Sequence, residues 1–160
     1  MRTLFQTIKQ QVLEGNDLVL ASITASSGST PRGAGSRMLI GKSGRIAGTI
    51  GGGAVEYRAE LMAQDILEKK ESCEHEFRLN RKDVENIGMI CGGDVTVFFQ
   101  YLDHNDPVIS EITETAAKSY EERKDFWLIC DLKTTSGMSL YSLSYGLIGN
   151  AAVPRMILRQ

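Results

Sequence analysis

The sequence predicts an α/β protein with a mixed β-sheet, flanking helices and glycine-rich loops gathered at one end. Short apolar runs typical of buried strands, such as 18–23, alternate with segments of helical periodicity, such as 54–70. Segments rich in glycine and serine separate these runs, as they do at strand ends. The chain has 160 residues, of which 42% are hydrophobic and 24% charged, and this length favours one compact domain over two full ones.

The first predicted elements are a short helix and a buried strand. Leu4, Ile8 and Val12 recur at helical spacing before Gly15, which is a common stop signal. The run 18–23 then reads as a strand that delivers the chain into a loop over 25–36.

A hairpin and a longer helix follow. Two strand-like runs, 37–40 and 45–50, flank a turn that contains two glycines, which indicates a hairpin. The return strand leads to three consecutive glycines and then to the helical period of 54–70, with Glu56 in the first turn, where the helix dipole favours negative charge.

The later part of the chain supplies more strands and one helix. The run 74–78 alternates like an edge strand, and 94–102 has the composition of a core strand. Asp106 and Pro107 are typical of a helix start, and this helix is expected to end at Ala117 or Tyr120.

The last strong strand is predicted over 126–132, with Trp127 and Cys130 as core residues. We therefore expect a main domain over 1–105 and a helix with a strand-rich extension over 106–160, packed on the first part.

Two of the glycine-bearing segments have the composition of an anion cradle. In the loop 25–36, hydroxyl groups stand beside Arg32, whose planar fork of donors suits a phosphate or carboxylate. The triple glycine enters a helix N-terminus, where backbone N–H groups attract anions. The alternative for the first segment is an ordinary turn between strands. For the second, it is a sharp turn with Glu56 as a dipole partner.

A third segment, 88–93, places Cys91 beside two glycines at a strand entrance. Glycine neighbours leave the sulfur open to approach, and nearby N–H donors would lower the pKa of the thiol and favour thiolate as a soft metal ligand. The alternative is a small buried apolar residue, which is the common state of a free cysteine.

Composition and charge exclude several classes of function. The net charge of -2 gives no electrostatic reason to bind nucleic acid. The apolar runs are far too short to span a membrane, and the start of the chain lacks a signal-peptide core, so we expect a cytoplasmic protein. Three widely spaced cysteines suggest neither a disulfide framework nor a zinc site.

Three blocks taken together resemble the XdhC/CoxI family, the xanthine dehydrogenase accessory factors. They are Ser26–Arg32, Gly48–Gly53 with Glu56, and Gly88–Gly93, and they occur in the family's order. The resemblance covers about residues 10 to 103 and is more specific than any single glycine loop.

The resemblance implies a chaperone that carries the molybdenum cofactor, molybdopterin, as cargo. Such a protein holds the cofactor for sulfuration by a cysteine desulfurase and assists its insertion into a client molybdoenzyme of the xanthine dehydrogenase type. A homodimer is an open alternative to a monomer. Cys91 would be the metal ligand. The implied cofactor-binding residues are Ser27, Gly28, Ser29, Thr30, Arg32, Gly51, Gly52, Gly53, Glu56, Cys91, Gly92 and Gly93.

The sequence departs from the family pattern at two points. Some members have a cysteine directly after the glycines, where this chain has Ala54. Many members continue into a Rossmann-like domain, and no complete domain of this kind is predicted here. The absence of an obvious acid and base pair in the three blocks favours a carrier over a catalyst. The alternatives are an oxidoreductase or another enzyme acting on a phosphate-bearing small molecule, and an interaction module without cofactor.

Overall fold

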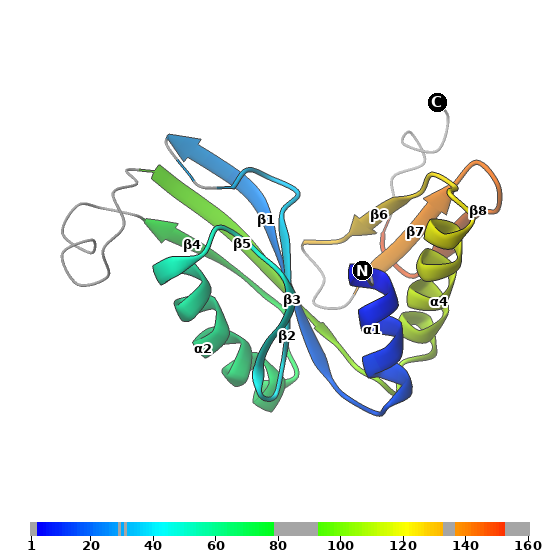
Figure 1. Ribbon diagram of the computed structural model, residues 1–160, viewed down its shortest axis with the longest axis horizontal. Coiled ribbons are helices and arrows are strands. Elements are labelled where there is room, and N and C mark those ends of the chain that lie inside the picture. Colours follow the sequence, from blue (N-terminus) through cyan, green and yellow to red (C-terminus); the bar gives the residue numbers. More distant parts are fainter. Residues whose placement is uncertain (1–2, 29, 31, 79–92, 133–136, 153–160) are drawn as a thin grey trace. The chain divides into compact units, whose positions relative to one another are not determined.

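The α/β class predicted from the sequence is confirmed by the computed structural model. The structure describes residues 3–28, 30, 32–78, 93–132 and 137–152, and these form three helices and two antiparallel sheets (Figure 1). The elements are α1 (Leu4–Leu13), β1 (Leu18–Gly28), β2 (Arg37–Gly41), β3 (Gly44–Gly48), α2 (Gly53–Lys69), β4 (Cys73–Arg78), β5 (Gly93–Leu102), α4 (Pro107–Glu121), β6 (Trp127–Cys130), β7 (Met138–Ser142) and β8 (Gly146–Gly149).

The larger sheet has five strands in the order β3-β2-β1-β5-β4. The hairpin of β2 and β3 confirms the prediction from the glycine-bearing turn, and β4 is an edge strand as predicted. α2 lies against β1, β2 and β3 and covers one face of this sheet (Figure 1). The alternating apolar positions of the strands point to α2 because successive side chains of a strand face opposite sides.

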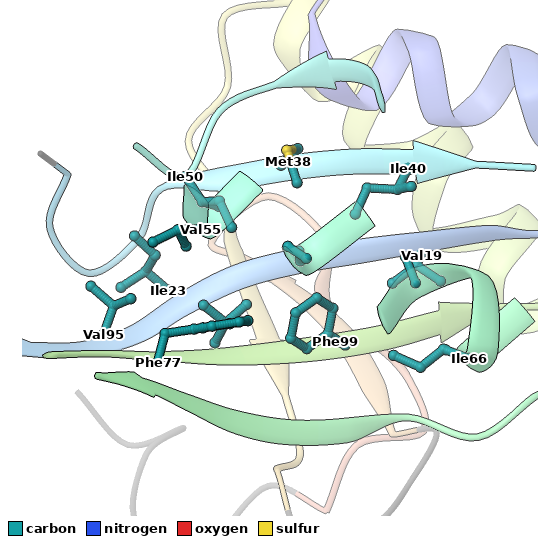
Figure 2. Close-up of a cluster of buried hydrophobic side chains, with 14 residues drawn as sticks. Val19, Ile23, Met38, Ile40, Ile50, Val55, Ile66, Phe77, Val95 and Phe99 are labelled. Atoms are coloured by element: carbon teal, nitrogen blue, oxygen red, sulfur yellow. The ribbon is translucent and has the colours of Figure 1, made fainter. Parts of the chain in front are cut away.

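The main core lies between α2 and this sheet (Figure 2). Val19, Ile40 and Phe99 are fully buried there, and Ala59 and Ala63 allow the helix backbone to approach the strands closely. Phe77 and Phe99 pack edge to face with ring centroids 6.3 Å apart. This core fixes the positions of the strand ends and of the first turn of α2.

The smaller sheet has the order β6-β7-β8, and α4 packs on β7 and β8. α1 packs along α4, and Phe5 of α1 makes an edge contact with Phe126, which directly precedes β6, with ring centroids 5.4 Å apart. α1 begins with a capping box in which Thr3 and Gln6 exchange hydrogen bonds between side chain and backbone. Asp106 caps α4, with Pro107 in its first turn, as its sequence predicts.

By compactness the chain divides into two units, residues 17–101 and residues 1–16 with 102–160. The helix α1 falls in the second unit because it packs on α4. The division into a family domain over 1–105 and an extension over 106–160 concerns sequence relationships and stays a prediction. None of the helices in the described ranges has the length and apolar character needed to cross a membrane.

Two expectations about individual residues are wrong. Ala25 to Gly28 continue β1 and are exposed, so the loop begins later than predicted, because the strand extends beyond the sheet's buried part. Trp127 is not a core residue. Its side chain is 52% exposed on the edge strand β6, where it contacts only the ring of Tyr141 among the aromatic residues described.

Candidate functional site

The first two glycine-bearing segments meet at one end of the larger sheet. The loop after β1 returns beside it, since the amide of Ile23 donates to Ser36 O and that of Gly35 donates to Ile23 O, both at 2.9 Å. The segment after β3 lies against the start of β2, where Thr49 N donates to Arg37 O at 2.8 Å. β2 therefore begins between the two segments.

Gly93, the last residue of the third segment, lies at the same end. Thr24 Oγ1 donates to Thr96 O at 3.3 Å, and Tyr101 Oη donates to Asp17 Oδ2 at 2.7 Å, so β5 runs antiparallel to β1 and begins where β1 ends. Gly93, its first residue, is half-buried. Ser29, Cys91 and Gly92, which the sequence also assigns to the site, lie outside the described residues.

Side chains next to the glycine-bearing segments pack beneath the candidate site (Figure 2). Ile23 of β1, Ile50 before the triple glycine, Val55 of α2 and Val95 of β5 lie together at one end of the core. Each is at most 5% exposed. The site at this end of the sheet therefore rests on a packed apolar base, which restricts the movement of the segments above it.

The loop that follows β1 presents its polar groups to solvent. Ser27, Gly28 and Arg32 are exposed, and Thr30 is half-buried. Gly28 has a φ of 67°, in the left-handed region that glycine adopts without strain. Within the described ranges, no carboxylate forms an ion pair with Arg32. Its guanidinium is therefore accessible to an anionic ligand.

The triple glycine makes a turn that other residues adopt only with strain. The φ angles of Gly51, Gly52 and Gly53 are 132°, 79° and 56°. A Cβ at Gly52 would meet no atom within 4 Å, so this turn faces open space. Among the described residues, no side chain caps the first turn of α2. Uncapped N–H groups and the positive end of the helix dipole thus lie beside the turn.

Glu56 is directed into the protein rather than toward solvent. The residue is 7% exposed, and its Oε1 accepts from the Thr49 hydroxyl and, at 3.0 Å, from Ile50 N. Its Oε2 pairs with Arg45 Nη1 at 2.9 Å. The Thr49 hydroxyl also accepts from Gly51 N at 3.2 Å. The carboxylate therefore gathers donors from the chain that leads into the turn.

These contacts decide the charge state of Glu56. Burial by itself would raise the pKa of the carboxyl group, but hydrogen bonds from Thr49 and the amides of Gly52 and Ile50, together with the charge of Arg45, outweigh burial and lower the pKa below the ordinary value of 4.5. Glu56 is consequently ionised at neutral pH, and Arg45 offsets its charge.

Sequence reasoning missed Arg45 and Thr49. Arg45 was assigned only to a strand, and Thr49 to the same strand and to the family block Gly48–Gly53, but neither to the cofactor-binding residues. The pairing of β2 with β3 skips Ile46, with Leu39 opposite Ala47 and Ile40 opposite Arg45, and β3 ends at Gly48, before Thr49. Regular alternation along one strand therefore could not have placed both side chains against Glu56.

Comparison with known proteins confirms the resemblance seen in the sequence. Residues 12–78 match the model of the XdhC and CoxI family, a range that contains both the loop after β1 and the triple glycine. YqeB of Escherichia coli strain K12, described as an uncharacterized protein, is 41% identical over 80 residues, which are 49% of this chain and 14% of YqeB.

A solved structure shares the fold. The crystal structure of a xanthine dehydrogenase from Bacillus halodurans superposes with a TM-score of 0.72 at 13% sequence identity, covering 94% of this chain and 45% of that chain. The chain thus spans less than half the length of each of these two proteins.

Proposed function

Since residues 12–78 match the model of the XdhC and CoxI family, we propose that the protein binds the molybdenum cofactor as cargo and delivers it to a molybdoenzyme of the xanthine dehydrogenase type. The family match supports the first part of this proposal, a role as an accessory protein related to xanthine dehydrogenase. The second part, binding and delivery of the molybdenum cofactor, rests on hydrogen-bond donors that lie at one end of the larger sheet.

The observation that carries the proposal is the meeting of the two family segments at one end of the sheet. Arg32, nearby hydroxyl groups and the first turn of α2, which no described side chain caps, all come from these segments. The cofactor's pterin carries a phosphate, and phosphate is bound by this combination of guanidinium, hydroxyl and backbone N–H donors. The open space beside Gly52 admits a ligand close to the backbone.

The remaining parts of the proposal come from the sequence. Cys91 is proposed as the thiolate beside the molybdenum, because sulfur is a soft ligand that suits this kind of metal centre. A carrier would hold the cofactor while a cysteine desulfurase adds sulfur, and would then pass it to the client enzyme.

The test is to purify the chain from a host that makes the molybdenum cofactor and to measure bound molybdenum and pterin together. We expect both, in equal molar amounts, with the intact protein. A parallel preparation from a host that cannot make the cofactor serves as the control. Protein that carries neither molybdenum nor pterin from the first host, yet is folded by circular dichroism, would contradict the proposal.

A further inference from the structure

We propose that Arg45, Thr49 and Glu56 form a clamp that positions the triple-glycine turn, and that Glu56 acts through this turn rather than by contacting the ligand. This inference rests on the proposed function of the site. It assigns a role to Arg45 and Thr49, neither of which is among the cofactor-binding residues implied by the sequence.

The first argument is that both oxygens of the carboxylate already have partners within the protein. Oε1 already accepts from Thr49 and Ile50, and Oε2 is paired with Arg45 at 2.9 Å. The residue is also among the buried polar residues of the chain, at 7% exposure. A ligand would have to compete with these contacts at a buried position, and a buried carboxylate that loses its partners is strongly disfavoured.

The second argument is that the clamp ties the turn to the sheet at several points. The Thr49 hydroxyl donates to Glu56 and accepts from Gly51 N, so one side chain bridges the helix and the turn. The Thr49 amide is bonded to Arg37 O, at the start of β2. Because β2 follows the loop that carries Arg32, the clamp also fixes the triple-glycine turn relative to that loop.

The third argument concerns charge. An ionised carboxylate in the first turn of α2 would repel an anionic ligand at the same helix end. Arg45 Nη1 neutralises it at 2.9 Å, and the Arg45 side chain is itself 48% exposed and so can remain solvated. The other acidic group near this pair is Glu60, one turn along α2, whose Oε2 accepts from Arg45 N at 3.3 Å.

The clamp is tested by amide hydrogen exchange of the ligand-free protein combined with cofactor retention. Thr49→Val removes the bridging hydroxyl with little change of shape, and Glu56→Gln removes the charge at constant volume. We expect exchange in peptides that contain Gly51–Gly53 to accelerate by about tenfold in each variant, and cofactor retention to fall by a similar factor. Thr49→Ser, which keeps the hydroxyl, should restore both, and Glu68→Gln at the exposed far end of α2 should change neither.

The two measurements separate positioning from direct contact. If Glu56 were a ligand contact, Glu56→Gln would lower retention while exchange in the ligand-free protein stayed at the wild-type rate, and the clamp would be refuted. Unchanged exchange in Thr49→Val would refute it as well. Because exchange needs no cofactor, the clamp can be confirmed even if the intact protein binds none, which would count against the proposed function alone.

Discussion

At the residue scale, the candidate site contains an exposed cation and an ion pair of which only the carboxylate is buried, and these should respond differently to substitution. Arg32 faces solvent without a carboxylate partner among the described residues, whereas Arg45 is committed to Glu56. Arg32 can therefore bind a ligand, whereas Arg45 stabilises the protein itself. Stability and binding measurements therefore distinguish their roles.

Arg32→Ala should weaken cofactor retention without lowering stability. A lost charge-assisted hydrogen bond typically costs about 1.5–3 kcal/mol, which corresponds to about tenfold or more in affinity. Lys42→Ala is the matched control, since it removes an exposed positive charge from the turn between β2 and β3, at the other end of these strands. Equal retention by wild type and Arg32→Ala, measured as molybdenum per protein, would remove Arg32 from the site.

Glu56 should make the stability of the protein depend on pH in the acidic range. Its pKa is lowered in the folded state, so its contribution is present above the unfolded pKa and is lost as the pH falls through the folded pKa. We expect Glu56→Gln to lower the free energy of unfolding by about 1–3 kcal/mol at neutral pH. The difference from wild type, measured by urea unfolding, should shrink steadily below about pH 4.5. A difference that is independent of pH would show that charge is not the cause.

At the scale of elements, two hairpins end in the same way. Gly48 at the end of β3 and Gly149 at the end of β8 both have positive φ angles, 75° and 101°. A Cβ at Gly48 would lie 2.3 Å from Arg37 O, and one at Gly149 would lie 2.3 Å from Met138 O. Each return strand thus passes so close to its partner's backbone that only glycine fits.

Gly48→Ala should consequently destabilise the protein more than Gly52→Ala does. Both positions have a positive φ, near 75° and 79°, and Gly52 combines it with a ψ of -176°, so both substitutions carry backbone strain of about 1–3 kcal/mol. Only Gly48 adds a collision with backbone, whereas Gly52 faces open space. The comparison is made by thermal unfolding of the two variants. Similar losses would mean that β3 moves away from β2 at little cost.

Some of these elements could be predicted from the sequence and others could not. Helix limits were predicted well because Asp106 and Pro107 are local signals that act within one turn. The first two glycine segments meet because β1, β2 and β3 are antiparallel neighbours, so β1 and β3 end at the same end of the sheet. The exposure of Trp127 was not predictable, because a four-residue apolar strand has the same sequence pattern at a sheet edge as in a core.

At the scale of the whole molecule, α1 belongs to the same compact unit as α4, although the two helices are far apart in the sequence. α1 is distant in sequence from α4 but packs on it, and Ile8 on its buried face is 1% exposed. Two further contacts reach α4: Lys9 pairs with Glu114 at 3.4 Å, and Gln6 Nε2 donates to Glu121 at 3.0 Å. The amino-terminal helix should therefore stabilise the carboxy-terminal half of the chain.

Ile8→Ala tests this assignment. Removing a buried side chain of this size costs about 2–5 kcal/mol, and sub-global opening concentrates the loss in the unit that contains the cavity. We expect amide hydrogen exchange to accelerate most in α4 and β7. Ile66→Ala, a matched cavity in the core beneath α2, should instead accelerate exchange most in β1 and β2. If Ile8→Ala acted mainly on β1 and β2, residues 1–16 would belong energetically with the five-stranded sheet, and the boundary near residue 105 drawn from the sequence would describe folding better than the compact units do.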